Sequence, residues 1–115
     1  MLRYIDEDRT GAARMNDEEA RPFRALGDPV RWVVLRHLAA APGEVGASEL
    51  ADVVTVGQPT LSYHLAVLRE AGLIERRKEG RQHFHRIRPE AVAELAEFLE
   101  AGLLKGPTVD EQTTA

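Results

Sequence analysis

Hydrophobic residues recur at helical spacing in several stretches of the chain, and residues that begin or end helices bound each stretch. Asp28-Pro29 is the clearest beginning, because aspartate suits the N-cap and a proline at the first helical position loses no hydrogen bond. The hydrophobic residues that follow at helical spacing are Val30, Val33, Val34, Leu38 and Ala41. Pro42-Gly43 ends this stretch, so the pattern predicts a helix that begins at Pro29.

A shorter helix is predicted ahead of this one. Asn16 or Asp17 can cap a helix that runs to Leu26, and acidic residues at 17–19 suit its positive N-terminal end. Pro22 fits only a first turn or a kink, and Gly27 ends the helix. Residues 1–16 show no sustained period, so we expect them to form a mobile arm or a frayed first helix.

Two further helices are predicted around a glycine-containing turn. A short helix covers about Ser48–Val54, and Gly57 stands in the turn after it. The next helix covers about Gln58–Ala71, with its hydrophobic side formed by Leu61, Leu65 and Leu68 and with Gly72 at the C′ position. Two helices joined in this way are typical of a helix-turn-helix.

A hairpin and a final helix complete the pattern. A strand begins at Leu73-Ile74, Glu79-Gly80 makes a turn, and Gln82–Ile87 returns. Pro89 then opens a last helix, and the hydrophobic stripe along it consists of Val92, Leu95, Ala96, Leu99 and Leu103. The predicted fold is mainly α with a two-stranded wing: a winged helix-turn-helix of about five helices over residues 17–105, followed by a disordered tail at 106–115.

The distribution of charge changes the picture that net charge gives. The 115 residues carry 15 Lys and Arg against 19 Asp and Glu, a net charge of −4, which by itself argues mildly against a nucleic-acid partner. Residues 57–88, however, hold seven Arg or Lys against three Glu, so the predicted second helix of the helix-turn-helix and the wing carry +4. A polyanion responds to this local field.

Composition also excludes several classes of protein. The chain has no cysteine, so disulfide scaffolds, thiolate metal sites and cysteine nucleophiles are excluded. No hydrophobic run is long enough for a membrane span and the start lacks a signal-peptide hydrophobic region, so we expect a soluble cytoplasmic protein. The sequence shows no phosphate loop, nucleophile elbow or acid–base pair, so we expect no enzyme activity and no cofactor.

Four motifs in order resemble those of the ArsR/SmtB family of bacterial winged-helix repressors. They are Phe23–Arg31 (FRALGDPVR), Gln58–Leu65 (QPTLSYHL), Leu68–Ile74 (LREAGLI) and Glu79-Gly80-Arg81 in the wing. The resemblance covers about Phe23 to Leu99. It implies a homodimer that binds an imperfect inverted repeat in a promoter and is released by an inducer.

The chain departs from the family where many members sense metals. Gly46 and Ser48 stand at the positions of a Cys-x-Cys sensor, and the last helix has four glutamates but no histidine for a zinc or nickel site. The resemblance therefore implies DNA binding but does not identify the inducer. His83 and His85 share one face of a wing strand as metal-ligand candidates. The simpler interpretation is two partly buried imidazoles that are hydrogen-bonded, or that lie next to phosphates when they are protonated.

The helix at 58–71 is expected to enter the major groove, with its N-terminal turns nearest the bases. The candidate DNA-binding residues are Ser48, Gln58, Thr60, Ser62, Tyr63 and His64 with Arg77, Lys78 and Arg81 of the wing. The last-helix stripe from Val92 to Leu103, joined by the first helix, is the expected dimer interface; its alternative is packing within one subunit. Besides a zinc- or nickel-responsive repressor, the main alternative is a winged helix that binds only proteins.

Overall fold

The computed structural model describes residues 14–105 of the chain. Most of the expected N-terminal arm, residues 1–13, and the expected tail at 106–115 lie outside the described residues. In chain order the elements are α2 (Asp17–Leu26), α3 (Pro29–Ala40), β1 (Val45–Gly46), α4 (Ala47–Val53), α5 (Gln58–Glu70), β2 (Ile74–Glu79), β3 (Gln82–Ile87), α6 (Pro89–Leu99) and a π-helical extension, η2 (Glu100–Leu104). The predicted order of helices, hairpin and last helix is confirmed.

Local capping explains where the first two helices begin. The Asn16 side chain accepts a hydrogen bond from the Glu19 backbone N–H (2.7 Å), and Glu19 accepts one from the Asn16 N–H (2.9 Å), so Asn16 caps α2. The helix continues through Pro22 to Leu26. Asp28 caps α3 by accepting from the N–H groups of Val30 (2.8 Å) and Arg31 (3.1 Å), as predicted.

The buried side of α3 differs from the predicted one by one position. Val34, Leu35 and Leu38 are buried, whereas Val33 is 42% exposed. The prediction that Val33 lies on the core side is therefore wrong, and Leu35 takes that place. Both residues are hydrophobic, so the sequence pattern alone could not rank them; the packing of α3 against β3 and α5 decides which faces inward.

The wing is part of a three-stranded antiparallel sheet with strand order β1-β3-β2. The two-residue strand β1 was not predicted; it pairs Val45 with His85. Glu79 pairs with Gln82, so the two loop residues are Gly80 and Arg81 rather than the predicted Glu79-Gly80. Gly80 takes a positive φ of 63°, which glycine adopts without steric cost and which this tight turn requires at its first position.

The core lies where α3, α4 and α5 meet the base of the sheet. Its largest fully buried hydrophobic side chains are Leu38, Leu50, Leu61, Leu68 and Leu73, so leucines predicted on the inner side of the helix-turn-helix do anchor it. Gly72 ends α5 in the left-handed region at φ 78°, as predicted from its position after the helix.

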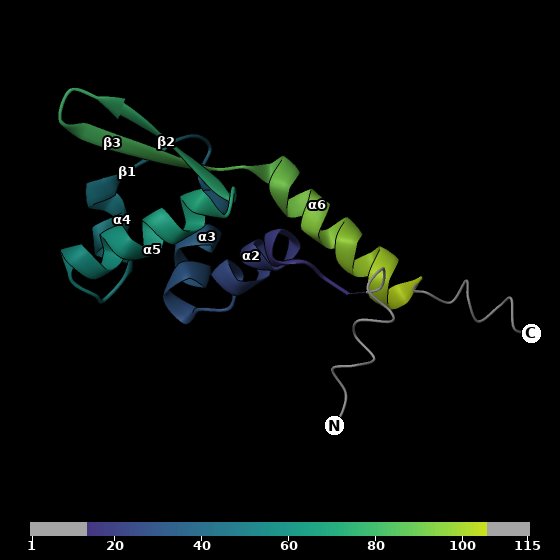
Figure 1. The fold of residues 1–115 in the computed structure, drawn as a ribbon. Helices are drawn as coiled ribbons and strands as arrows, with labels where there is room; N and C mark the ends of the chain where they lie inside the picture. Colours follow the sequence, from purple (N-terminus) through teal and green to yellow (C-terminus); the bar gives the residue numbers. More distant parts are fainter. Residues whose placement is uncertain (1–13, 106–115) are drawn as a thin grey trace, which may run out of the picture.

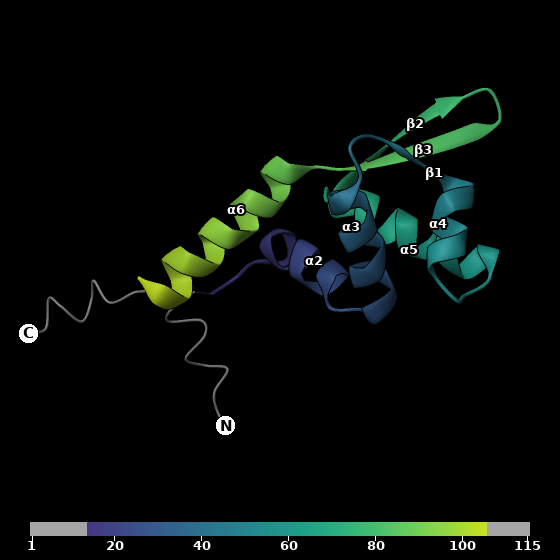
Figure 2. The same cartoon turned by 180° about the vertical axis from the view of Figure 1, so that it is seen from behind.

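Most of the last helix lies outside this core, and only Ala91 and Leu95 of its described residues pack against it. In Figures 1 and 2, α6 and η2 extend from the body formed by α2–α5, at the opposite end of the molecule from the tip of the β2–β3 hairpin. No residue of α6 or η2 is fully buried in this single chain. The pair that links α6 to α2 is Phe98 with Phe23, whose ring centroids are 5.7 Å apart. The part of the chain that the structure describes contains no helix long and hydrophobic enough to cross a membrane.

Candidate nucleic-acid interface

The N-terminal half of α5 presents polar side chains to solvent. Gln58, Thr60, Ser62 and Tyr63 are all exposed, Tyr63 to 62%. The helix is held in place on its other side by buried leucines, because Leu61, Leu65 and Leu68 point into the core. The expected DNA-binding residues of this helix thus form one accessible surface, and Ser48 of α4 is exposed near it. Such a surface can offer side-chain donors and acceptors to base edges.

His64 is the exception among the expected contacts on α5. Its side chain is only 8% exposed, so the prediction that it faces outward is wrong. Position 64 lies three residues after Leu61 and four before Leu68, which places it on the buried side of the helix. There its Nδ1 lies 2.9 Å from a guanidinium nitrogen of Arg31, in the first turn of α3.

Arg31 ties this part of α5 to the turn between α2 and α3. Its Nε donates to the carbonyl of Ala25 (2.7 Å), while its backbone N–H donates to the cap residue Asp28. These backbone hydrogen bonds and the Arg31 charge keep the pKa of Asp28 below its usual value. His64 therefore fixes the position of α5 from inside the domain instead of offering a group to a ligand.

One face of the wing carries cations that are already paired with carboxylates. Arg77 donates to Glu44 (2.8 Å) and to Glu79 (2.7 Å), and its guanidinium lies 5.0 Å from the Phe84 ring centroid. The hydrogen bonds from Arg77 lower the pKa of Glu44, and those same bonds raise the pKa of Arg77. Arg86 is paired with Glu75 in the same way (2.9 Å from Nε). Of the wing residues expected to contact DNA, Arg77 is thus the one engaged inside the protein.

The other face of the wing carries positive and imidazole groups without carboxylates. Because side chains alternate along a strand and paired residues share a face, Arg76 lies beside His85, and Lys78 lies beside His83. No described residue between 14 and 105 makes an ion pair or hydrogen bond with the side chains of Arg76 or Lys78. Arg76 was not among the expected contacts, although strict alternation in Arg76-Arg77-Lys78 could have separated it from Arg77.

The two wing histidines differ in burial. His85 is 2% exposed, and its Nδ1 has no hydrogen-bond partner, so the expectation of a satisfied imidazole is wrong for this atom. Burial, followed by the charges of Arg69 and Arg76, lowers the pKa of His85 to about 4. His83 is half-buried, and burial, followed by the charges of Arg76 and Lys78, lowers its pKa. Within residues 14–105, no three His, Asp or Glu side chains gather in a way that would hold a metal ion.

Hydrophobic side chains gather on the last helix instead. Of the expected dimer residues, Val92 is 42%, Leu99 44% and Leu103 77% exposed, and Ala96 is also exposed. Leu95 is half-buried and packs against the core of its own chain. The predicted stripe therefore has one residue that packs within the subunit and several that remain exposed in the described part of the chain.

These features define a winged helix-turn-helix protein: a leucine-anchored helix with an exposed polar side, next to a basic hairpin. A helix-turn-helix domain model matches residues 26–77. The biofilm growth-associated repressor of Agrobacterium fabrum is 39% identical over 84 residues, which cover 73% of this chain and 70% of that protein.

Solved structures agree. The transcriptional repressor BigR from Xylella fastidiosa is 34% identical and matches with a TM-score of 0.57 over 87% of this chain and 94% of that one. An ArsR-like transcriptional regulator from Rhodococcus sp. RHA1, also 34% identical, gives 0.63 over 72% and 76%. The chain belongs to the ArsR/SmtB family of winged-helix, DNA-binding transcriptional regulators, as its motifs predict.

Proposed function

We propose that this protein is a homodimeric repressor that binds an inverted-repeat operator with one α5 helix of each protomer in the major groove. The observation that carries the proposal is the exposed polar surface of α5, opposite the leucines that anchor this helix. An anchored helix presents its side chains at fixed positions, which direct readout of bases requires.

The exposed residues suit different parts of the duplex. The amide of Gln58 can make paired hydrogen bonds to adenine, and Tyr63 can contact a thymine methyl group with its ring. Thr60 and Ser62 can serve bases or phosphates, and Ser48 adds a hydroxyl donor beside the helix. Lys78 and the exposed Arg81 at the wing tip suit the flanking backbone, whereas Arg77 would first have to leave Glu44.

The dimer interface is proposed on α6 and η2, with α2 beside them. Val92, Ala96, Leu99 and Leu103 form a hydrophobic surface that one chain leaves exposed, and the same surface on a second copy would cover it around a two-fold axis. Two recognition helices related in this way read half-sites about one turn of DNA apart. An inducer would act without thiolate ligands from this chain, which contains no cysteine.

Selection from a pool of randomised DNA duplexes tests the DNA-binding proposal. We expect the purified protein to enrich an inverted repeat and to bind it with a log–log salt slope of about −5 to −7, as expected for roughly 6–8 neutralised phosphates per dimer. Gln58→Ala should relax the preference at one base pair of each half-site. No enriched sequence together with a flat salt response would contradict the proposal and favour a winged helix that binds only proteins.

Two single substitutions separate the dimer interface from the DNA surface. Leu103→Glu places a charge on the proposed interface and should give monomers in sedimentation analysis. Tyr63→Glu, at an exposed residue of α5, should leave the dimer intact and abolish operator binding. Leu95 is unsuitable for this test because it packs on the core of its own chain. A Leu103→Glu protein that stays dimeric would place the interface elsewhere.

A further inference from the structure

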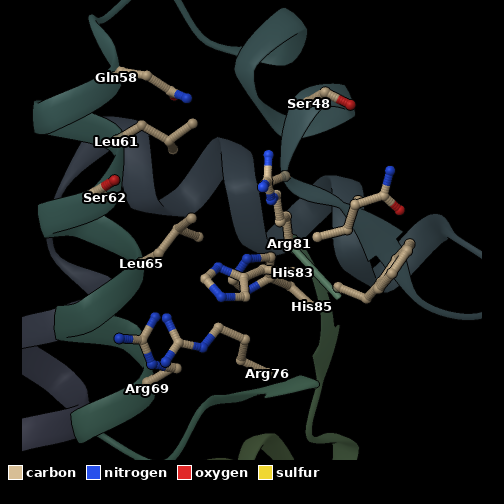
Figure 3. A pocket seen from close by; sticks show the side chains of 14 residues that line it. Ser48, Gln58, Leu61, Ser62, Leu65, Arg69, Arg76, Arg81, His83 and His85 are labelled. Atoms are coloured by element: carbon tan, nitrogen blue, oxygen red, sulfur yellow. The ribbon is translucent and has the colours of Figure 1, made fainter. Parts of the chain in front are cut away.

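A cavity separates α5 from the face of the wing that carries no carboxylates. Its volume is about 540 Å³, which falls within the range of roughly 300–1,000 Å³ of small-ligand sites. Figure 3 shows α5 on one side of it and the side chains of the wing on the other, with the imidazoles of His83 and His85 between them. Gln58 and Ser62, which belong to the proposed DNA surface, also line the cavity.

The charged groups that line this cavity are all cations. Arg69 comes from α5, Arg76 from β2 and Arg81 from the wing turn, and no Asp or Glu lines the cavity. Burial, and then the charge of Arg76, lowers the pKa of Arg69, so the protein holds two guanidinium groups near each other at a cost in electrostatic energy. Figure 3 places both groups at the same end of the cavity.

The carboxylates of this region lie on the opposite face of the wing. Glu75 and Glu79 lie on the face of β2 opposite to that of Arg76 and Lys78. Glu75 is paired with Arg86, and Glu79 is paired with Arg77. Glu44 is held by Arg77. No carboxylate of the sheet can therefore neutralise the cavity cations without breaking an existing ion pair.

Hydrogen-bonding groups complete the lining. His85 is almost fully buried at the cavity wall, and the structure gives its ring no partner at Nδ1. Ser48, Ser62 and Gln58 place hydroxyl and amide groups around the same space. Guanidinium, hydroxyl and imidazole donors around a space without carboxylates suit a tetrahedral anion with several acceptor oxygens.

We propose that this cavity, which Arg69, Arg76 and His85 line, is a phosphate-binding site that seats a backbone phosphate of bound DNA between α5 and the wing. The inference rests on the proposed function for the source of that phosphate. The site itself rests on the cavity, so a free phosphate-sized anion can occupy it when DNA is absent. This proposal assigns the main contact between the wing and DNA to Arg76 instead of Arg77, because Arg77 is already paired with Glu44 and Glu79.

Histidine NMR signals in the full-length protein test this site directly. Inorganic phosphate added at constant ionic strength, with chloride as the reference, should shift the His83 and His85 ring signals in a saturable way and leave His37 unchanged. A short DNA duplex of random sequence should shift the same two signals. Arg76→Gln should weaken both effects at least about 5-fold. Its control Arg86→Gln, on the paired strand β3 and on the opposite face of the sheet, should behave like the wild type.

The two arms separate the sources of the phosphate group. Shifts with both probes, or with only one of them, support the site and say whether DNA, a free anion or both occupy it. Unmoved His83 and His85 signals with both probes, or an Arg76→Gln protein that responds like the wild type, would overturn it. DNA binding by a protein whose His83 and His85 signals move with neither probe would overturn the site and leave the proposed repressor function standing. Phosphate binding without any DNA binding would support the site and overturn the proposed repressor function.

Discussion

The two faces of the β2–β3 hairpin have similar numbers of cations and opposite uses for them. On one face, Arg77 and Arg86 are paired with Glu44, Glu79 and Glu75. On the other, Arg76 and Lys78 lie beside two histidines, and Arg76 and Arg69 line a cavity that has no carboxylate in its wall. The cations of the first face have carboxylate partners within the protein, whereas we propose that those of the second face are neutralised by a bound anion.

This difference shows why a count of charges does not identify contacts with DNA. The +4 of residues 57–88 includes Arg77 and Arg86, whose charge is locally cancelled. Exposed ion pairs of this kind stabilise a fold only weakly. They do, however, keep carboxylates away from the cavity, because each glutamate lies with its arginine on the far side of the sheet.

Reversing the charge on the cavity face should have the largest effect. Each phosphate contact contributes about 0.9 to the log–log salt slope, so near 0.1 M salt its loss costs about 10-fold in affinity, or about 100-fold for the two contacts of a dimer. Arg76→Glu adds repulsion and should weaken operator binding by more than about 100-fold in fluorescence anisotropy at fixed salt. Arg86→Gln should change it less than about 3-fold. Equal losses in the two variants would erase the distinction between the faces.

Replacing the buried histidine should raise stability while it removes part of the cavity. A buried polar atom without a partner costs about 1–3 kcal/mol, so His85→Leu should increase the free energy of unfolding by about 1–2 kcal/mol in urea at neutral pH and fixed protein concentration. His37→Leu is the control, because His37 is bonded to Glu49 at the surface (2.7 Å). A lower free energy of unfolding for His85→Leu than for the wild type would show that the unpaired Nδ1 does not destabilise the fold.

The same histidine makes stability depend on pH with a defined sign. The folded pKa of His85 is about 4, below the value near 6.5 of an unfolded histidine, so the unfolded chain binds the extra proton. Wild-type stability should therefore fall as pH decreases from about 6.5 to 4, and its deficit relative to His85→Leu should widen.

DNA affinity should depend on pH in the opposite direction. His85 faces the positive charges of Arg69 and Arg76 as well as His83, and a phosphate placed among them raises the pKa of both histidines. The complex then binds more protons than the free protein, so affinity should rise as pH decreases through the raised pKa values of the complex. Operator affinities of the wild type and of His83→Gln/His85→Leu check this. A pH response retained by the double variant would assign it to other groups.

The smallest effect is expected on the paired face. Glu44→Gln removes the main partner of Arg77 and should lower the midpoint of urea unfolding only slightly, because both side chains are partly exposed and solvent screens their attraction. Operator affinity should stay within about 2-fold of the wild type. A marked gain in affinity would mean that Arg77, once released, also reaches the DNA.

The parts of the fold that local signals control were predictable from the sequence. Asp28-Pro29 begins α3, and Gly72 ends α5 at a positive φ, because capping and glycine geometry act within a few residues. The two-residue strand β1 has no periodicity of its own and exists only because β3 pairs with it. The prediction could not have found it.

The candidate site shows the same division. The exposed side of α5 followed from the spacing of Leu61, Leu65 and Leu68. The roles of His64 and Arg77 were harder to predict, because each is held by a partner 33 residues away. Arg31 holds His64, and Glu44 holds Arg77. Such contacts depend on how the elements pack, and a pattern along the chain does not contain them. The alternation that separates Arg76 from Arg77 was present in the sequence.

The salt dependence of operator binding by Arg76→Gln and Arg86→Gln tests the central claim most directly. Each variant removes one arginine. Arg76 and Arg86 lie on the adjacent strands β2 and β3 and on opposite faces of the sheet. We predict that Arg76→Gln makes the log–log slope shallower by about 2 per dimer, while Arg86→Gln leaves the wild-type slope unchanged. Identical slopes for wild type and Arg76→Gln, or an equal loss in both variants, would contradict the claim that the cavity face of the wing holds the DNA backbone.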